Sequence, residues 1–173
     1  MTATVPERLR WAVDRLDVRA GHRVLEIGCG RGVALALLGE VPEVARVVAV
    51  DRSASALRAA GQRNADLVAA GRAVLREGEL ATVDLVGERF DRVLAVNVNL
   101  FWTGPATIEL DRLAASLAPG GRLHLVYQPP DAARAADLAV RLTDRLTAAG
   151  WTVHDLTRLD GPPPLLGVVA HPA

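Results

Sequence analysis

Three glycines at alternate positions, with a carboxylate just before them, are the residues of this sequence best suited to holding a ligand. Gly28, Gly30 and Gly32 give the spacing G-x-G-x-G, and Glu26 stands two residues before the first glycine. Glycine lets the backbone turn sharply and approach a ligand without an intervening Cβ. The N–H groups at the start of a following helix are free to donate hydrogen bonds. A turn of this composition is typical of a nucleotide-like ligand.

The spacing of the glycines argues against a dinucleotide. The dinucleotide fingerprint G-x-G-x-x-G needs its third glycine at position 33, which is Val33. Glu26 would repel a pyrophosphate, whereas it can accept hydrogen bonds from a ligand's ammonium group through water. The turn therefore favours a cationic ligand that lacks a pyrophosphate.

A buried strand and a helix must hold this turn in place. Val24, Leu25 and Ile27 form the apolar run of a central parallel strand, and residues 33–38 continue as a helix. Further strands are expected at 46–50, 73–76, 92–96 and 122–127, and further helices at 6–16, 53–70, 106–118 and 131–149. Residues 151–159 and 166–170 indicate a hairpin. We expect an α/β fold, a three-layer doubly wound Rossmann-like sheet of about seven strands, mostly parallel with an antiparallel C-terminal hairpin strand.

The length and charge of the chain favour a single domain. The 173 residues carry 20 acidic and 20 basic side chains, and every basic residue is arginine, which suggests a GC-rich bacterial genome. We divide the chain into a helical cover (1–20), a cofactor-binding core (21–130) and a C-terminal helix and hairpin (131–173). No apolar run has the length of a membrane span, and the single cysteine and the N-terminal residues indicate a cytoplasmic protein. Zero net charge and few aromatic residues make nucleic-acid binding an unfavoured function.

The glycine turn resembles the first motif of the class I S-adenosylmethionine-dependent methyltransferases. In that family a hydrophobic strand leads to an acidic residue and G-x-G-x-G, as at Glu26 and the three glycines. Residues 47–51, Val-Val-Ala-Val-Asp, are similar to the strand that ends in a ribose-binding carboxylate. Residues 90–97 and 117–126 resemble the fourth strand and the helix, P-G-G turn and fifth strand. The resemblance covers about residues 18–171, and it implies S-adenosylmethionine as cofactor and S-adenosylhomocysteine as product.

The cofactor site should lie beyond the carboxyl ends of the parallel strands, where doubly wound sheets bind ligands. The resemblance implies that Asp51 holds the ribose and that an acidic residue after the third strand, Glu79, meets the adenine amino group; Glu79 as a solvated loop residue is an equal alternative. Cys29 lies within the glycine turn and is therefore included among the cofactor-binding residues. We interpret its thiol as structural. The complete set of predicted cofactor-binding residues is Glu26, Gly28, Cys29, Gly30, Gly32, Asp51, Arg52, Glu79, Leu80 and Asn97.

The acceptor site is expected where residues 97–102, Asn-Val-Asn-Leu-Phe-Trp, leave the fourth strand. The candidate catalytic residues are Asn97, Trp102 and Tyr127. Asn97 offers polar contacts near the methionine moiety, and Trp102, expected in a loop, offers an apolar wall. Phe101 is equally compatible with such a wall and with the core. Tyr127 is a candidate general base if the acceptor is a hydroxyl.

These predictions favour an enzyme that transfers a methyl group from S-adenosylmethionine to a small-molecule acceptor, because the short chain leaves little surface for recognising a macromolecule. A non-catalytic S-adenosylmethionine-binding module or subunit is the alternative, and a nicotinamide oxidoreductase is disfavoured by Val33 and Glu26. We predict no metal, since the histidines lack metal-ligand spacing and Asn97 and Asn99 stand where metal-dependent members have acidic residues. An N-P-P-Y type motif is also absent. The sequence leaves the oligomeric state open.

Overall fold

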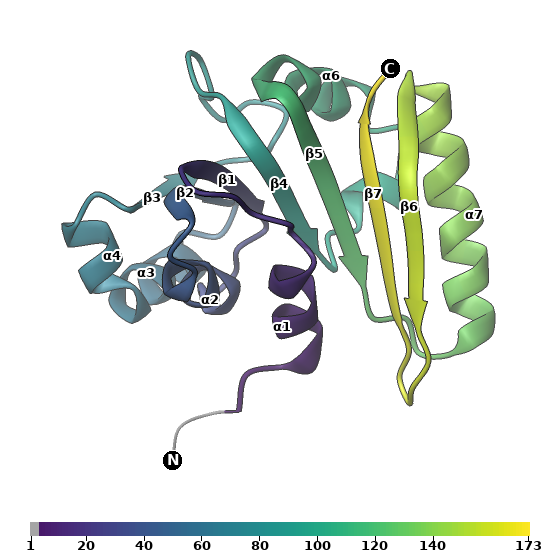
Figure 1. Ribbon diagram of the computed structural model, residues 1–173, viewed down its shortest axis with the longest axis horizontal. Coiled ribbons are helices and arrows are strands. Elements are labelled where there is room, and N and C mark those ends of the chain that lie inside the picture. Colours follow the sequence, from purple (N-terminus) through teal and green to yellow (C-terminus); the bar gives the residue numbers. More distant parts are fainter. Residues whose placement is uncertain (1–3) are drawn as a thin grey trace.

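The computed structural model describes residues 4–173, which build a seven-stranded sheet in the order β3-β2-β1-β4-β5-β7-β6 (Figure 1). Neighbouring strands from β3 to β5 are parallel, whereas β7 is antiparallel to both β5 and β6. The predicted fold class, mostly parallel with antiparallel C-terminal strands, is confirmed. The strands are β1 (His22–Ile27), β2 (Val44–Asp51), β3 (Ala73–Glu77), β4 (Phe90–Val96), β5 (Leu117–Tyr127), β6 (Trp151–Leu159) and β7 (Leu165–Pro172).

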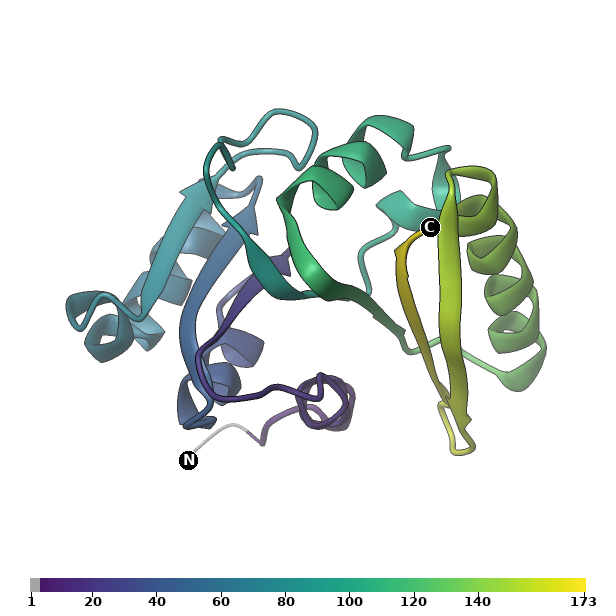
Figure 2. The same ribbon diagram turned by 45° about the horizontal axis from the view of Figure 1, so that its top comes forward.

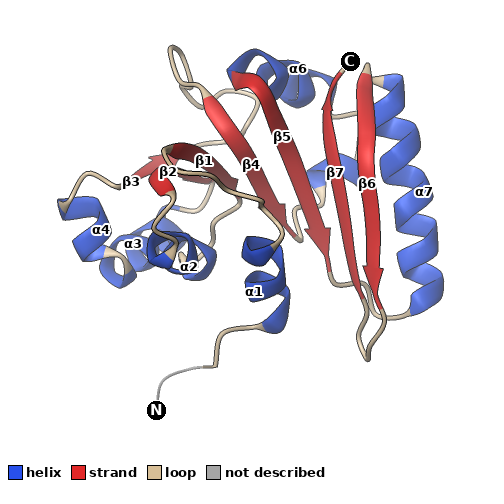
Figure 3. Cartoon of the chain, in the orientation of Figure 1, coloured by secondary structure: helices blue, strands red, loops and turns tan. Residues whose placement is uncertain are grey.

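Helices cover both faces of the sheet and make it a three-layer structure (Figure 2). The first face carries α1 (Glu7–Asp14), α2 (Val33–Glu40), α3 (Ala54–Arg63) and α4 (Ala65–Ala69). The second carries α5 (Leu100–Thr103), α6 (Thr107–Ser116) and α7 (Ala132–Ala148). The connection from β3 to β4 is a loop without a helix (Figure 3). Within residues 4–173, no helix has the length and apolarity needed to cross a membrane.

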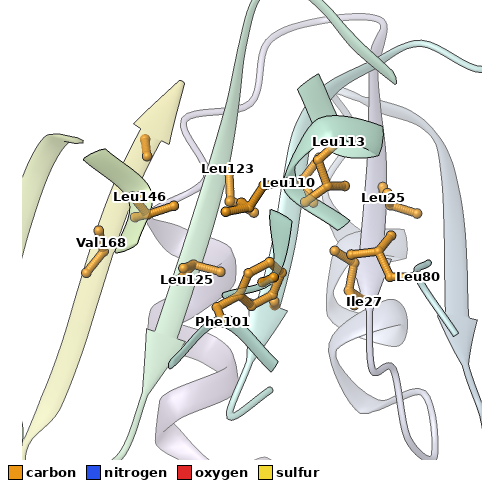
Figure 4. Packing of buried hydrophobic residues seen from close by; sticks show 14 of the residues in the cluster. Leu25, Ile27, Leu80, Phe101, Leu110, Leu113, Leu123, Leu125, Leu146 and Val168 are labelled. Carbon is orange, nitrogen blue, oxygen red and sulfur yellow. The ribbon is translucent and has the colours of Figure 1, made fainter. Parts of the chain in front are cut away.

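Side chains that alternate along the strands feed two hydrophobic clusters, one on each face. Val24 packs with α1 and α2, whereas its neighbour Leu25 packs on the face covered by α6 and α7. Figure 4 shows this second cluster, in which Leu25, Ile27 and Leu80 lie near Leu110 and Leu113 of α6. Phe101 is in the same cluster and is only 2% exposed. Its interpretation as a core residue is therefore confirmed.

Three local expectations differ from the structure. The helix predicted over residues 53–70 is divided at Asn64 into α3 and α4. The P-G-G sequence at 119–121 does not separate a helix from a strand, because α6 already ends at Ser116 and these residues lie inside β5, where the register with β4 shifts. Trp102 lies in α5 and not in a loop, since the Trp102 and Thr103 N–H groups both donate to the Asn99 carbonyl. The division into 1–20, 21–130 and 131–173 stays a prediction, and residues 1–3 lie outside the described part of the chain.

Candidate active site

The glycine turn connects β1 to α2 with three residues in the left-handed region. Gly28, Gly30 and Gly32 have φ angles of +69°, +53° and +72°. A Cβ on Gly30 would meet no atom within 4 Å, so open space lies beside the middle of the turn. A Cβ on Gly32 would lie 2.8 Å from the Ala60 Cβ. Gly30 therefore leaves room for a ligand, whereas Gly32 allows α3 to pack closely against the turn.

The end of α3 holds this turn, a role that the sequence did not reveal. The Asn64 side-chain amide donates to the carbonyls of Gly32 (3.0 Å) and Ala60 (2.9 Å), and the Arg63 Nε donates to the Arg31 carbonyl (3.1 Å). Asn64 is buried. The only signal in the sequence is an asparagine inside a helical stretch, where its side chain disfavours a continuous helix.

A cavity of about 500 Å³, here called the main cavity, lies at the carboxyl ends of β1 to β4. It brings together most of the predicted cofactor residues from separate loops. Leu80 is buried in its wall, whereas Arg52 and Glu79 are exposed at its edge. Gly30 and Gly32 are not among the residues that line it. The lining residues from the predicted set are Gly28, Asp51, Arg52, Glu79, Leu80 and Asn97.

Asp51 is fixed by two backbone N–H groups at the edge of the main cavity. Its Oδ2 accepts from the Gly30 N–H (2.7 Å) and its Oδ1 accepts from the Ser53 N–H (2.9 Å). Each carboxylate oxygen has a further lone pair, so Asp51 retains capacity to accept from a ligand. The contact with Gly30 also ties the carboxylate directly to the glycine turn.

A second cavity of about 240 Å³, the α1 cavity, lies between α1 and the glycine turn. Glu26 lines it, is only 4% exposed, and has a buried Oε2 without a hydrogen-bond partner in the described chain. Burial, and then the nearby charge of Asp51, raise the pKa of Glu26 to about 8. A buried carboxyl without a partner is costly, and a ligand ammonium would supply the missing donor and charge. Arg8 of α1 lines the same cavity and was not predicted as a site residue.

Cys29 also lines the α1 cavity, and its surroundings disfavour the thiolate form. The side chain is buried, and its Sγ lies 3.8 Å from the Gly30 carbonyl. Burial, with smaller contributions from Glu26 and Asp51, raises the pKa of the thiol to about 12. At neutral pH the thiol therefore stays protonated, in agreement with a structural interpretation.

A third cavity of about 440 Å³, the α7 cavity, contains Trp102 and Tyr127. The geometry does not favour the general-base role predicted for Tyr127. Its hydroxyl donates to the Val98 carbonyl (2.6 Å), and burial raises the pKa of the phenol above its ordinary value. The Trp102 ring is half-buried, and its Nε1 is buried without a partner within the described chain.

Asn97 lines all three cavities. It follows β4 with φ +56°, a left-handed conformation that asparagine tolerates better than most residues. Its backbone N–H donates to the Val126 carbonyl (2.8 Å), and its Oδ1 accepts from the Gln128 N–H (2.9 Å). Asn99 lies in the predicted acceptor segment 97–102, where it was given no individual role, and it lines both the main and the α7 cavity. All three cavities therefore border the residue that follows β4.

Within residues 4–173, no three His, Cys, Asp or Glu side chains are placed together as metal ligands. His124 and His154 lie inside β5 and β6, as predicted, and line none of the three cavities. S-Adenosylmethionine, in contrast, fits the residues present. The open space at Gly30, the Glu26 oxygen without a partner in residues 4–173 and the half-buried Asp51 carboxylate in the cavity lining suit a ligand with an ammonium group and ribose hydroxyls.

Comparison with known proteins identifies the family. Residues 24–121 match the family model described as a methyltransferase domain. A release factor glutamine methyltransferase of Xylella fastidiosa (strain 9a5c) is 42% identical over 85 residues, which are 49% of this chain and 30% of that protein. A trans-aconitate 2-methyltransferase of Paracidovorax citrulli (strain AAC00-1) is 36% identical over 123 residues, which are 68% of this chain and 42% of that protein. The chain thus spans less than half the length of these two relatives.

A solved structure extends the similarity over nearly the whole fold. The glycopeptide N-methyltransferase MtfA complexed with S-adenosylmethionine has a TM-score of 0.77 at 18% identity, covering 96% of this chain and 93% of that chain. At this identity the likeness shows the fold alone, whereas the family model covers more than half of the residues. The chain therefore belongs to the class I S-adenosylmethionine-dependent methyltransferases.

Proposed function

We propose that this chain transfers the methyl group of S-adenosylmethionine to a small-molecule acceptor. The observation that carries this proposal is that three cavities border Asn97. Two of them are lined by the glycine turn and can hold one extended ligand. The third also borders Asn97 and shares Asn99 with the main cavity, so an acceptor bound in it would lie next to the cofactor.

We assign the adenosine part of the cofactor to the main cavity and its methionine moiety to the α1 cavity. In the main cavity, Asp51 would accept hydrogen bonds from the ribose hydroxyls, Glu79 would meet the adenine amino group from the edge, and Leu80 would supply an apolar wall. In the α1 cavity, Glu26 would hold the ammonium group of the methionine moiety. On these assignments the sulfur would lie near Asn97, which lines both cavities.

The bound cofactor supplies a methyl group on a positively charged sulfur. What the chain contributes is position and the exclusion of water. Asn97 is held on both its backbone and its side chain, so it can orient the two ligands beside it. Trp102 lines the acceptor side and would help to exclude water from the reacting groups.

The size of the α7 cavity supports a small acceptor. Its volume of about 440 Å³ is in the range of small-molecule sites, about 300–1,000 Å³. The two relatives named above act on different kinds of substrate by name, a release factor and trans-aconitate, so their identity does not decide the acceptor. We also infer a bacterial, cytoplasmic protein, supported by the arginine-only basic residues and the single buried cysteine.

Calorimetry and a transfer assay test this function. We expect S-adenosylmethionine and S-adenosylhomocysteine to bind, NAD not to bind, and labelled methyl to pass to a small acceptor with formation of S-adenosylhomocysteine. Cofactor binding without S-adenosylhomocysteine formation, across broad panels of small molecules and proteins, would favour the non-catalytic module. Tighter binding of NAD would contradict the assignment of the turn.

A further inference from the structure

The α7 cavity combines apolar side chains with two carboxamides. Trp102 of α5, Leu138 of α7 and Pro129 of the segment after β5 supply apolar surface. The carboxamides belong to Asn97, which follows β4, and to Gln128, which follows β5. The volume of about 440 Å³ suits a compact molecule whose carbon framework packs on the apolar wall and whose polar group contacts the carboxamides.

Two hydrogen bonds decide which atoms these carboxamides present to a ligand. The Asn97 Oδ1 accepts from the Gln128 N–H (2.9 Å), and the Gln128 Oε1 accepts from the Arg8 Nη1 of α1 (3.3 Å). Because each oxygen already accepts, the amide nitrogen of each side chain remains to donate. The bond between Asn97 and Gln128 also holds the two residues next to each other. An acceptor bound here therefore meets hydrogen-bond donors on neighbouring residues.

Arg134 adds a positive charge to the lining of the same cavity. Its Nη1 lies 3.8 Å from the Asp137 Oδ2, whereas the Arg141 Nε donates to that oxygen at 2.9 Å. The Asp137 carboxylate, which also lines the cavity, is thus paired more closely with Arg141 than with Arg134. With 69% of its side chain exposed, Arg134 is free to turn toward a ligand. These three side chains together carry one positive charge in excess.

Donors and positive charge together favour a ligand group that accepts hydrogen bonds and is negatively charged. A carboxylate is such a group, because it only accepts and has two oxygens with about four lone-pair sites. Its hydrogen bonds are stronger than those of neutral groups and offset the cost of removing it from water. With an ordinary pKa of about 4, it is ionised at neutral pH and needs no base before it reacts.

We propose, resting on the function inferred above, that the acceptor is a compact carboxylic acid with an apolar framework, and that it is methylated on a carboxylate oxygen. The Asn97 and Gln128 amide nitrogens donate to one oxygen, and Arg134 supplies the positive charge. A lone pair of the other oxygen forms a bond to the methyl carbon while the carbon–sulfur bond of the cofactor breaks. That electron pair stays on the sulfur of S-adenosylhomocysteine. The second product is a neutral methyl ester, and no proton is transferred.

Three acids that differ in framework test this proposal on the full chain: benzoate, trans-cinnamate and octanoate, each beside its primary amide and its alcohol. Labelled methyl transfer is measured after subtraction of the rate without protein, and label that mild base releases as methanol is counted as ester. We expect base-labile label on at least one acid and no label on the amides and alcohols. Calorimetry with S-adenosylhomocysteine present should show that the same acid binds about tenfold or more tightly than its amide, since bonds to a charged group are stronger.

Other outcomes overturn the proposal in distinguishable ways. Base-stable label on an acid places the methyl group on another atom. Methylation of an alcohol, lost in Asp137→Asn, shows a hydroxyl acceptor with Asp137 as its base. Methylation of a protein, or of none of these compounds while S-adenosylhomocysteine binds, also rules out the carboxylate. Failure to bind S-adenosylmethionine overturns the proposed function together with this inference.

A matched pair of substitutions locates the carboxylate. Gln128→Glu keeps the length of the side chain and an acceptor for Arg8, but it replaces the donating nitrogen by a charged oxygen. The KM of the methylated acid, and its Kd in the presence of S-adenosylhomocysteine, should rise by about ten- to a hundredfold, because a bond to a charged group is lost. S-Adenosylhomocysteine affinity should stay within a few fold.

Gln62→Glu is the control, since it adds the same charge at an exposed position of α3 and should change neither constant. If Gln128→Glu does not fold, Gln128→Met removes the donor without adding charge and should raise the KM by about tenfold. Equal KM and Kd values for the Gln128 and Gln62 variants would place the carboxylate elsewhere.

Discussion

The cofactor side and the acceptor side of this site are built in different ways. The cofactor side is formed mainly by the backbone of the glycine turn and by a carboxylate that backbone N–H groups hold in place. This carboxylate is Asp51, which accepts from the Gly30 and Ser53 N–H groups. On the acceptor side, the walls are side chains from a four-residue helix, the end of a strand and α7. One side depends on a fixed path of the chain, and the other on which side chains occupy a few positions.

This difference decides how much of each side can be recognised from the sequence. A left-handed turn restricts its positions to glycine, so the cofactor side leaves a motif that is visible in sequence. Trp102 or Leu138 can be replaced by other apolar residues without changing the backbone, so the acceptor side can be adapted while the fold is kept. Variants on the two sides should accordingly separate cofactor affinity from methyl transfer.

The largest effect is expected at Asp51. Asp51→Ala removes the ribose contact and the acceptor for the Gly30 N–H, and losing bonds to a charged group should weaken S-adenosylhomocysteine binding by about a hundredfold. Asp66→Ala, at an exposed position of α4, is the control and should leave affinity unchanged. Calorimetry measures both, with circular dichroism to confirm folding. Equal affinities for the two variants would remove Asp51 from the cofactor site.

Asn64 tests whether the turn depends on α3. Asn64→Ala leaves the Gly32 and Ala60 carbonyls without this donor in a buried place and should lower the free energy of unfolding by about 1–3 kcal/mol. Arg63→Ala, which removes an exposed contact to the neighbouring Arg31 carbonyl, should cost less than half as much. Urea unfolding compares the variants. A smaller loss for Asn64→Ala than for Arg63→Ala would show that α3 does not hold the turn through Asn64.

Trp102 should affect the acceptor side alone. Trp102→Ala opens the wall of the α7 cavity and should reduce methyl transfer by about tenfold, the usual order for a lost pocket contact, with S-adenosylhomocysteine affinity within a few fold. Trp102→Phe keeps an aromatic wall and should retain most of the rate. Loss of cofactor affinity in the alanine variant would instead assign Trp102 to the cofactor site.

The smallest effect concerns the proton on Glu26. Because the pKa of Glu26 rises from 4.5 to about 8 on folding, the folded chain binds more protons than the unfolded chain between these values. The contribution of Glu26 to stability is therefore fully present below about pH 4.5 and is lost as the pH rises toward 8. Glu26→Gln should flatten the pH dependence of unfolding in this window.

The same shift predicts proton release when a cationic cofactor binds. An ammonium near Glu26 favours its ionised form, so binding at pH 7 should release less than one proton per chain. Calorimetry in two buffers of different ionisation enthalpy measures this release, and Glu26→Gln should abolish it. Identical heats in both buffers for the unaltered chain would show that the ammonium does not reach Glu26.

The sequence predicted the fold well because its strands are short apolar runs separated by recognisable helices and turns. It also located the loops that form the main cavity, since parallel strands bring their carboxyl ends to one edge of the sheet. It missed the division of the helix at Asn64, because that depends on hydrogen bonds to Gly32 in another loop. The contact between the Tyr127 hydroxyl and the Val98 carbonyl, which opposes a general-base role, likewise joins residues distant in sequence.

The central claim is that the cofactor sulfur lies beside Asn97 and faces the α7 cavity. A crystal structure of the chain with S-adenosylhomocysteine tests it most directly. We predict ribose hydroxyls on Asp51, the ammonium toward Glu26, and the sulfur beside Asn97. A complex with the adenine in the α7 cavity, or with the sulfur turned away from Asn97, would contradict the account.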